Sequence, residues 1–98
     1  MTAMMIVTAK IHDRERFVSG YGAAAAKLVA EFGGRYLIRA PGAELLEGEG
    51  MDGASVVVSE WPDKAAALRF WNSPEYAAAR QLRDGLADVS VLLVEAPG

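Results

Sequence analysis

The sequence predicts a single α+β domain in which one antiparallel sheet carries helices on one of its faces. Two observations lead to this prediction. Four apolar segments rich in β-branched residues alternate with helical segments in the order strand, helix, strand, strand, helix, helix, strand. The chain also has 98 residues, which suits one domain with one thin hydrophobic core.

The first strand is expected over residues 4–11, because this segment is apolar on both faces and ends at a charged segment. Asp13 is a suitable N-cap for the helix predicted over residues 14–32, in which apolar side chains recur at helical spacing. Gly33 and Gly34 end this helix, as glycines beyond a C-cap usually do.

A second strand is predicted over residues 35–40 and a third over residues 54–60. Pro41-Gly42 indicates a turn, residues 43–47 an extension or hairpin arm, and the glycine-rich residues 48–53 a loop. Side chains alternate along a strand. This alternation places Arg35, Leu37 and Arg39 on one face and Tyr36 and Ile38 on the other.

Two consecutive helices follow, and the corner between them is the most informative stretch of the chain. Asp63 is the predicted N-cap of a helix that ends near Trp71. Pro74 is unsuited to a helix interior but suits a first turn, so a second helix is expected over residues 74–87 with Ser73 as its N-cap. The last strand is expected over residues 89–95.

This order of elements corresponds to a ferredoxin-like βαββααβ arrangement, with a four-stranded antiparallel sheet and helices on one face. The opposite face of the sheet then has no cover within one chain. Since the first, third and fourth strands are apolar on both faces, we expect a homodimer in which two chains pack through the open sheet face.

Composition narrows the classes of partner and chemistry. The net charge is −3 with no run of Lys or Arg, so we expect binding neither to nucleic acid nor to a membrane. There is no cysteine, which excludes disulfides, a thiolate nucleophile and a cysteine zinc site. The single histidine, His12, has no clustered ligands around it, so no metal and no cofactor are expected. Without a signal peptide or spanning segment, a cytoplasmic location is the expectation.

Several motifs together resemble those of the DUF1330 family. They are Phe32-Gly33-Gly34-Arg35-Tyr36-Leu37, Leu46-Glu47-Gly48, the valine strand that leads into Glu60-Trp61-Pro62, and Trp71-Asn72-Ser73-Pro74-Glu75-Tyr76. The resemblance covers nearly the whole chain, as a single domain over residues 1–98. It implies the dimeric α/β-barrel form of the ferredoxin-like fold and leaves the function open.

Seven polar and aromatic residues are the candidates for a ligand site in a cleft between helices and sheet. Arginine offers a planar set of donors for an anion, tyrosine a hydroxyl, and tryptophan a flat apolar wall. The candidates are Tyr21, Arg35, Trp71, Asn72, Ser73, Tyr76 and Arg83.

Six of the seven candidates also have a structural interpretation. Tyr21 and Trp71 suit the core, and Ser73 suits a helix cap. Arg35 suits an ion pair with Glu60 or Glu95, and Arg83 one with Glu75 or Asp84, while Asn72 suits a bond to the backbone at the corner.

Two functions are compatible with the sequence. The first is binding of a small organic or anionic molecule without catalysis. The second is a cofactor-independent enzyme, of isomerase or monooxygenase type, that acts on a small organic substrate. The sequence contains no recognisable acid–base or nucleophile set that would assign catalytic residues.

Overall fold

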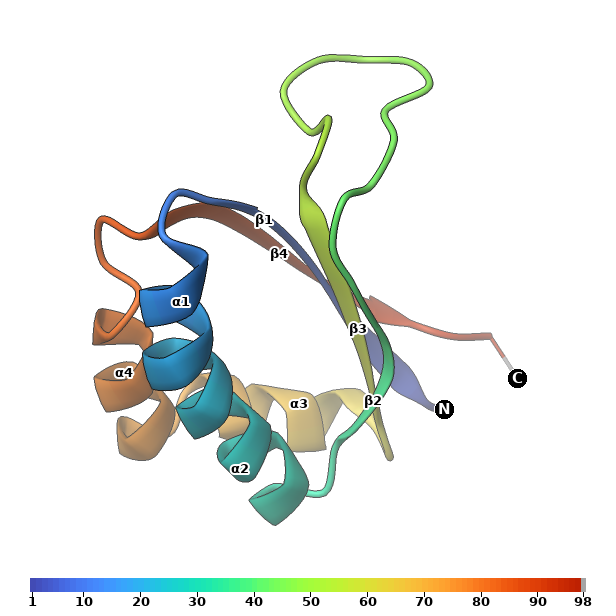
Figure 1. The fold of residues 1–98 in the computed structure, drawn as a ribbon. Coiled ribbons are helices and arrows are strands. Elements are labelled where there is room, and N and C mark those ends of the chain that lie inside the picture. Colours follow the sequence, from blue (N-terminus) through green and yellow to red (C-terminus); the bar gives the residue numbers. More distant parts are fainter. Residues whose placement is uncertain (98) are drawn as a thin grey trace.

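A computed structural model describes residues 1–97 of the chain and confirms the predicted fold class. The four strands within these residues form one sheet in the order β2-β3-β1-β4, and all neighbouring strands are antiparallel. The helices all cover the same face of this sheet (Figure 1). The strands are β1 (Ala3–Ile11), β2 (Arg35–Ala40), β3 (Ser55–Trp61) and β4 (Ala87–Glu95).

The helix predicted over residues 14–32 is continuous but not regular. It consists of α1 (Arg14–Arg16), a π-helical segment η1 (Phe17–Gly22) and α2 (Ala23–Glu31). Asp13 caps its start as predicted, because its side chain accepts from the backbone N–H of Arg16 at 3.1 Å. Two glycines lie within η1 and weaken its preference for a regular α-helix. Wide turns of this kind are rare and often lie at functional sites.

The end of this helix explains the Gly33-Gly34 pair. The N–H of Gly34 donates to the carbonyl of Val29 at 2.8 Å, and the N–H of Gly33 donates to the carbonyl of Ala30 at 3.2 Å. This is the Schellman pattern, and Gly33 has the positive φ of 91° that it needs. Gly34 has a different role, since a Cβ there would lie 2.8 Å from the ring of Trp61.

The face alternation predicted for residues 35–40 is wrong, because β2 has a register irregularity at Leu37. Tyr36 pairs with Ser59, and the next pair is Ile38 with Val58. The extra residue returns Arg39 to the face of Tyr36, which is the helix side, whereas Arg35 and Ile38 lie on the open side.

Residues between β2 and β3 form a long arm that projects away from the body of the domain (Figure 1). Ala43 exchanges two backbone hydrogen bonds at its base, donating to Ala54 at 2.9 Å and accepting from Gly53 at 2.8 Å. The predicted arm is therefore present as a hairpin-like base without a regular strand beyond it.

The corner between α3 (Lys64–Trp71) and α4 (Pro74–Gln81) is built as predicted. Asp63 caps α3 by accepting from the N–H of Ala66 at 2.8 Å. Ser73 Oγ accepts from the N–H of Tyr76 at 3.0 Å and donates to the carbonyl of Phe70 at 2.8 Å, so one hydroxyl joins the two helices.

The last helix is shorter than predicted. α4 ends at Gln81 instead of residue 87, and turns lead from it to Gly85, whose φ of 75° is incompatible with a continuing helix. β4 consequently begins at Ala87, two residues before its expected start at residue 89.

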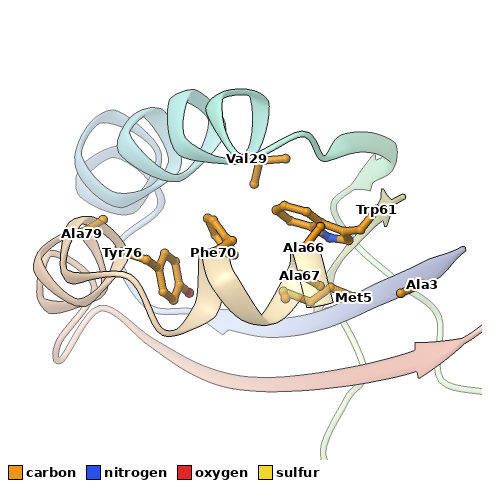
Figure 2. Packing of buried hydrophobic residues seen from close by; sticks show 9 residues of the cluster. All are labelled: Ala3, Met5, Val29, Trp61, Ala66, Ala67, Phe70, Tyr76 and Ala79. Carbon is orange, nitrogen blue, oxygen red and sulfur yellow. The ribbon is translucent and has the colours of Figure 1, made fainter. Parts of the chain in front are cut away.

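The core lies between the helices and the sheet (Figure 2). Trp61 and Tyr76 are the largest fully buried side chains, each with 1% of its surface exposed. Phe70 lies between them, with its ring centre 5.0 Å from that of Trp61 and 4.4 Å from that of Tyr76. The indole N–H of Trp61 donates to Ser59 Oγ at 3.0 Å, which satisfies its only polar atom.

Within residues 1–97, no helix covers the other face of the sheet (Figure 1), and this face carries exposed apolar side chains. The most exposed of them on this face is Leu92 (63%), followed by Ile38 (49%) and Val94 (44%). Val58 on β3 and Ile6 on β1 connect Ile38 on β2 to Leu92 on β4 in one row across the sheet. Within residues 1–97, no helix has the length and apolar character that crossing a membrane requires.

Candidate functional site

A cavity of about 240 Å³ lies between the helix layer and the covered face of the sheet. Its walls are mostly apolar, and a few polar side chains interrupt them. Pockets of this composition are typical of small-molecule sites. The apolar walls include Met5, Val7, Ala9, Val29, Val57, Phe70 and Val91, and the polar lining residues are Arg14, Tyr21, Tyr36, Arg39, Ser55, Ser59 and Tyr76.

The exposure of the lining residues shows where the cavity opens. Arg14 and Val18, at the start of the first helical segment, are exposed, and so are Arg39 and Pro41 at the end of β2. Tyr76, in contrast, is 1% exposed. The cavity therefore opens between the first helical segment and β2, and it closes against α4.

Two tyrosines meet in the wall of the cavity. Tyr21 from η1 and Tyr76 from α4 lie 55 residues apart in sequence, and their hydroxyl oxygens are 2.8 Å apart, which is a hydrogen bond. Tyr76 is held in place by Phe70 and Trp71, whose ring centres lie 4.4 Å and 5.3 Å from its own.

The surroundings of Tyr21 and Tyr36 favour the neutral form of their hydroxyls. Burial raises the pKa of Tyr21 well above its ordinary value, and the neighbouring Tyr76 adds to the shift. The cation of Arg83, stacked 5.1 Å from the centre of the Tyr21 ring, acts in the opposite direction with less effect. Burial also raises the pKa of Tyr36, against a smaller opposing effect of Arg39. At neutral pH the hydroxyls of Tyr21 and Tyr36 act as hydrogen-bond donors and acceptors and not as phenolates.

Two arginines line the cavity near its opening. Arg14 reaches across from α1 and donates to Ser55 Oγ on β3 at 2.9 Å. The guanidinium of Arg39 lies 4.5 Å from the centre of the Tyr36 ring, a cation–π contact that the register irregularity of β2 makes possible. Within residues 1–97, neither arginine forms an ion pair.

The structure brings together two of the seven residues predicted for the site. Tyr21 and Tyr76 line the cavity and bond to each other. Arg83 packs on Tyr21 from outside the cavity instead of pairing with Glu75 or Asp84.

The other four predicted residues have positions away from the cavity. Arg35 forms an ion pair with Glu60 on the open side of the sheet, with donors 2.9 Å and 2.6 Å from one carboxylate oxygen. Trp71 packs on Tyr76 and beneath Arg80. Asn72 is the exposed C-cap of α3, and Ser73 is the buried N-cap of α4.

Several lining residues could not be recognised in the sequence. Arg14 looks like an ordinary residue of a helical first turn, and Arg39 falls on the wrong face if the strand alternates regularly. The signal for Ser55 and Ser59 was present, because these two serines lie four residues apart and so share one face of a valine-rich strand, with Val57 between them.

His12 takes part in a surface contact away from the cavity. Its Nε2 lies 3.1 Å from Asp88 Oδ2, and both side chains are exposed. Across residues 1–97, histidine, aspartate and glutamate side chains nowhere gather in a group of three or more that could hold a metal ion.

The fold and the cavity define a small ferredoxin-like α+β protein with an internal, ligand-sized pocket. The chain belongs to the DUF1330 family, a domain of unknown function, whose sequence model matches residues 2–97. A search of curated proteins finds no match.

Solved structures with the same fold include proteins of unknown function and one oxygenase. RPA0582 from Rhodopseudomonas palustris, of unknown function, has a TM-score of 0.78 and 18% identity over 99% of this chain and 83% of its own. SnoaB from Streptomyces nogalater, a cofactor-independent oxygenase, has a TM-score of 0.72 and 20% identity, with 99% and 94% covered. A dimeric ferredoxin-like protein of unknown function from Jannaschia sp. CCS1 has a TM-score of 0.75 and 14% identity, with 98% and 100% covered.

Proposed function

We propose that the protein binds a small organic molecule in the cavity between its helices and its sheet. The observation that carries this proposal is the cavity itself, which combines apolar walls with a few convergent polar groups. A buried cavity of about 150 Å³ is known to hold benzene. A cavity of about 240 Å³ therefore admits one ring with substituents, or an aliphatic chain of similar bulk.

A thermal-shift panel of small carboxylates, phenols, quinones and lactones tests this proposal. A ligand present at a hundred times its Kd adds about 2.7 kcal/mol to the free energy of unfolding. The blocking variant is Val57→Phe, which places a larger side chain on the strand that floors the cavity. Its matched control is Leu68→Phe, which adds a ring at an exposed position of α3 outside the cavity.

We expect at least one compound to stabilise the wild-type protein and the Leu68→Phe variant, and to leave Val57→Phe unchanged. Equal stabilisation of Val57→Phe by that compound would place binding elsewhere. A panel in which no compound raises the Tm of the wild-type protein would contradict the proposal.

A second candidate function is a cofactor-independent enzyme that uses the same cavity. The hydroxyl pair of Tyr21 and Tyr76 favours it, because a buried neutral tyrosine can donate a proton or a hydrogen bond to a substrate oxygen. The fold of the SnoaB oxygenase is compatible with it but assigns no activity. If a panel compound is turned over, Tyr76→Phe should slow the conversion. Conversion at an unchanged rate would show that the Tyr21–Tyr76 pair takes no part in the reaction.

The open face of the sheet supports a homodimer. Its apolar side chains, with Leu92 63% exposed, would be covered if two chains packed these faces together. The Jannaschia neighbour is a dimeric protein, which supports a dimer for this chain as well. We expect sedimentation velocity to show a dimer for the wild-type protein and a folded monomer for Leu92→Asp. A monomeric wild-type protein, or a variant that remains dimeric, would contradict this face as the interface.

A further inference from the structure

The charge of the cavity lining differs in sign from that of the whole chain. The chain has a net charge of −3. Within residues 1–97, however, the cavity lining contains two positively charged residues, Arg14 and Arg39, and no Asp, Glu, Lys or His. Within residues 1–97 no carboxylate pairs with either arginine. An anionic group of a ligand would therefore find two cations and no repelling neighbour.

The two arginines both lie near the opening of the cavity. Arg14 donates to Ser55, and Arg39 is register-paired with Val57, two residues further along the same face of β3. Two residues of a strand span roughly 7 Å. Arg14 thus reaches β3 from the helix layer, whereas Arg39 lies on the neighbouring strand with its guanidinium over the Tyr36 ring. Both residues are exposed and lie near the opening of the cavity.

The hydroxyl pair provides a different kind of contact deeper in the cavity. Tyr21 and Tyr76 together carry two hydroxyl protons, and the bond between their oxygens uses one of them. A ligand that fills the cavity displaces the water to which the second proton can donate. The buried donor then costs free energy unless the ligand itself supplies an acceptor.

The helical segment formed by α1 and η1 gives the distance between the arginines at the opening and the tyrosine pair deeper in the cavity. Arg14 and Tyr21 both line the cavity from this segment, seven residues apart. At the helical rise this separation is roughly 10 Å along the axis. The wall between the two ends is apolar and aromatic, with Phe17 and Val57 on opposite sides.

We infer that the ligand is an elongated organic carboxylate that enters with its uncharged end first. Its carboxylate lies at Arg14 and Arg39 near the opening, and its apolar body lies over β3. A carbonyl or similar acceptor oxygen at its inner end receives the free proton of the Tyr21–Tyr76 pair. This inference rests on the proposed binding function and adds to it the class and the direction of the ligand.

Three related probes test the inference by isothermal titration. 4-Acetylbenzoate has all three features, 4-acetylbenzamide lacks the charge, and 4-ethylbenzoate lacks the acceptor oxygen. We expect 4-acetylbenzoate to bind about tenfold more tightly than either relative, since a charge-assisted or buried hydrogen bond contributes on the order of one power of ten in Kd.

Variants assign each preference to its residues. Arg39→Gln should reduce the preference for 4-acetylbenzoate over 4-acetylbenzamide, whereas Arg35→Gln should leave it unchanged. Arg35 is the matched control because it lies on the same strand but on the open side, paired with Glu60. The double variant Tyr21→Phe/Tyr76→Phe should remove the preference for 4-acetylbenzoate over 4-ethylbenzoate and leave the preference over the amide, because either hydroxyl alone still carries a proton that it can donate.

Three results would overturn the inference. They are equal affinity for the acid and the amide, an equal effect of Arg39→Gln and Arg35→Gln, and no binding of 4-acetylbenzoate at millimolar concentration. If uncharged members of the broader panel still stabilise the wild-type protein but not Val57→Phe, the binding function stands and only the ligand class is wrong. If no compound behaves in this way, the proposed function fails as well.

Discussion

The hydrogen bond between Tyr21 and Tyr76 should appear as a measurable coupling in the stability of the fold. Tyr21→Phe removes the partner of a hydroxyl whose residue is only 1% exposed, so the orphaned Tyr76 group costs about 1–3 kcal/mol. Tyr76→Phe leaves the half-buried Tyr21, whose hydroxyl more readily reaches water, and the expected cost is about 0.5–1.5 kcal/mol.

The double variant should cost less than the sum of these two values, because it leaves no hydroxyl without a partner. Replacing both partners of a buried hydrogen bond by apolar groups of the same shape can be nearly neutral. We therefore expect a coupling of about 1 kcal/mol or more, which corresponds to roughly 4–8 °C in Tm for a domain of this size.

Urea-induced unfolding of the wild-type protein, the two single variants and the double variant measures this coupling. All four proteins must be compared at one concentration, because self-association would shift their apparent stabilities. Tyr36→Phe is a control that removes a hydroxyl from the same cavity wall outside the pair. Additive effects within about 0.3 kcal/mol would refute the coupled pair.

Three further predictions concern stability. Gly34→Ala should destabilise by about 1–3 kcal/mol, because its Cβ would lie 2.8 Å from the buried Trp61 ring, whereas Gly20→Ala meets open space; equal urea midpoints for the two variants would contradict this. Because the pKa of Tyr21 is higher in the folded than in the unfolded state, its contribution to the free energy of unfolding is complete below about pH 10 and is lost as the pH rises above that value. In urea titrations, the free energy of unfolding of Tyr21→Phe should therefore fall less steeply above about pH 10 than that of the wild-type protein. An equally steep fall would contradict the raised pKa of Tyr21. Ser73→Ala should cost about 1–2 kcal/mol, and a change of a few tenths would show that the cap is dispensable.

Local chemistry made most of the fold predictable. Asp13, Asp63 and Ser73 are cap residues whose side chains can satisfy free helical N–H groups, and the structure uses all three in this way. The Gly33-Gly34 pair likewise ends a helix by a known pattern of hydrogen bonds. Such signals depend on a few neighbouring residues, so a sequence displays them directly.

The parts of the site that were missed depend on long-range geometry. A single extra residue at Leu37 changes the face on which Arg39 lies, and nothing in the local sequence marks the irregularity. The contact between Arg14 and Ser55 joins residues 41 positions apart, and no periodicity reports it. The chemistry of tyrosine makes Tyr21 and Tyr76 candidates, but only the fold shows that they form one pair.

The most direct test of the central claim locates a bound compound in solution. Nuclear Overhauser effects between the most stabilising panel compound and assigned methyl groups would report which face of the sheet it contacts. If the compound binds in the cavity, we expect contacts to Val57 and Val91, which line it. Contacts to Val58 and Leu92 instead, on the open face, would show that the compound binds outside the cavity and would contradict the proposed binding site.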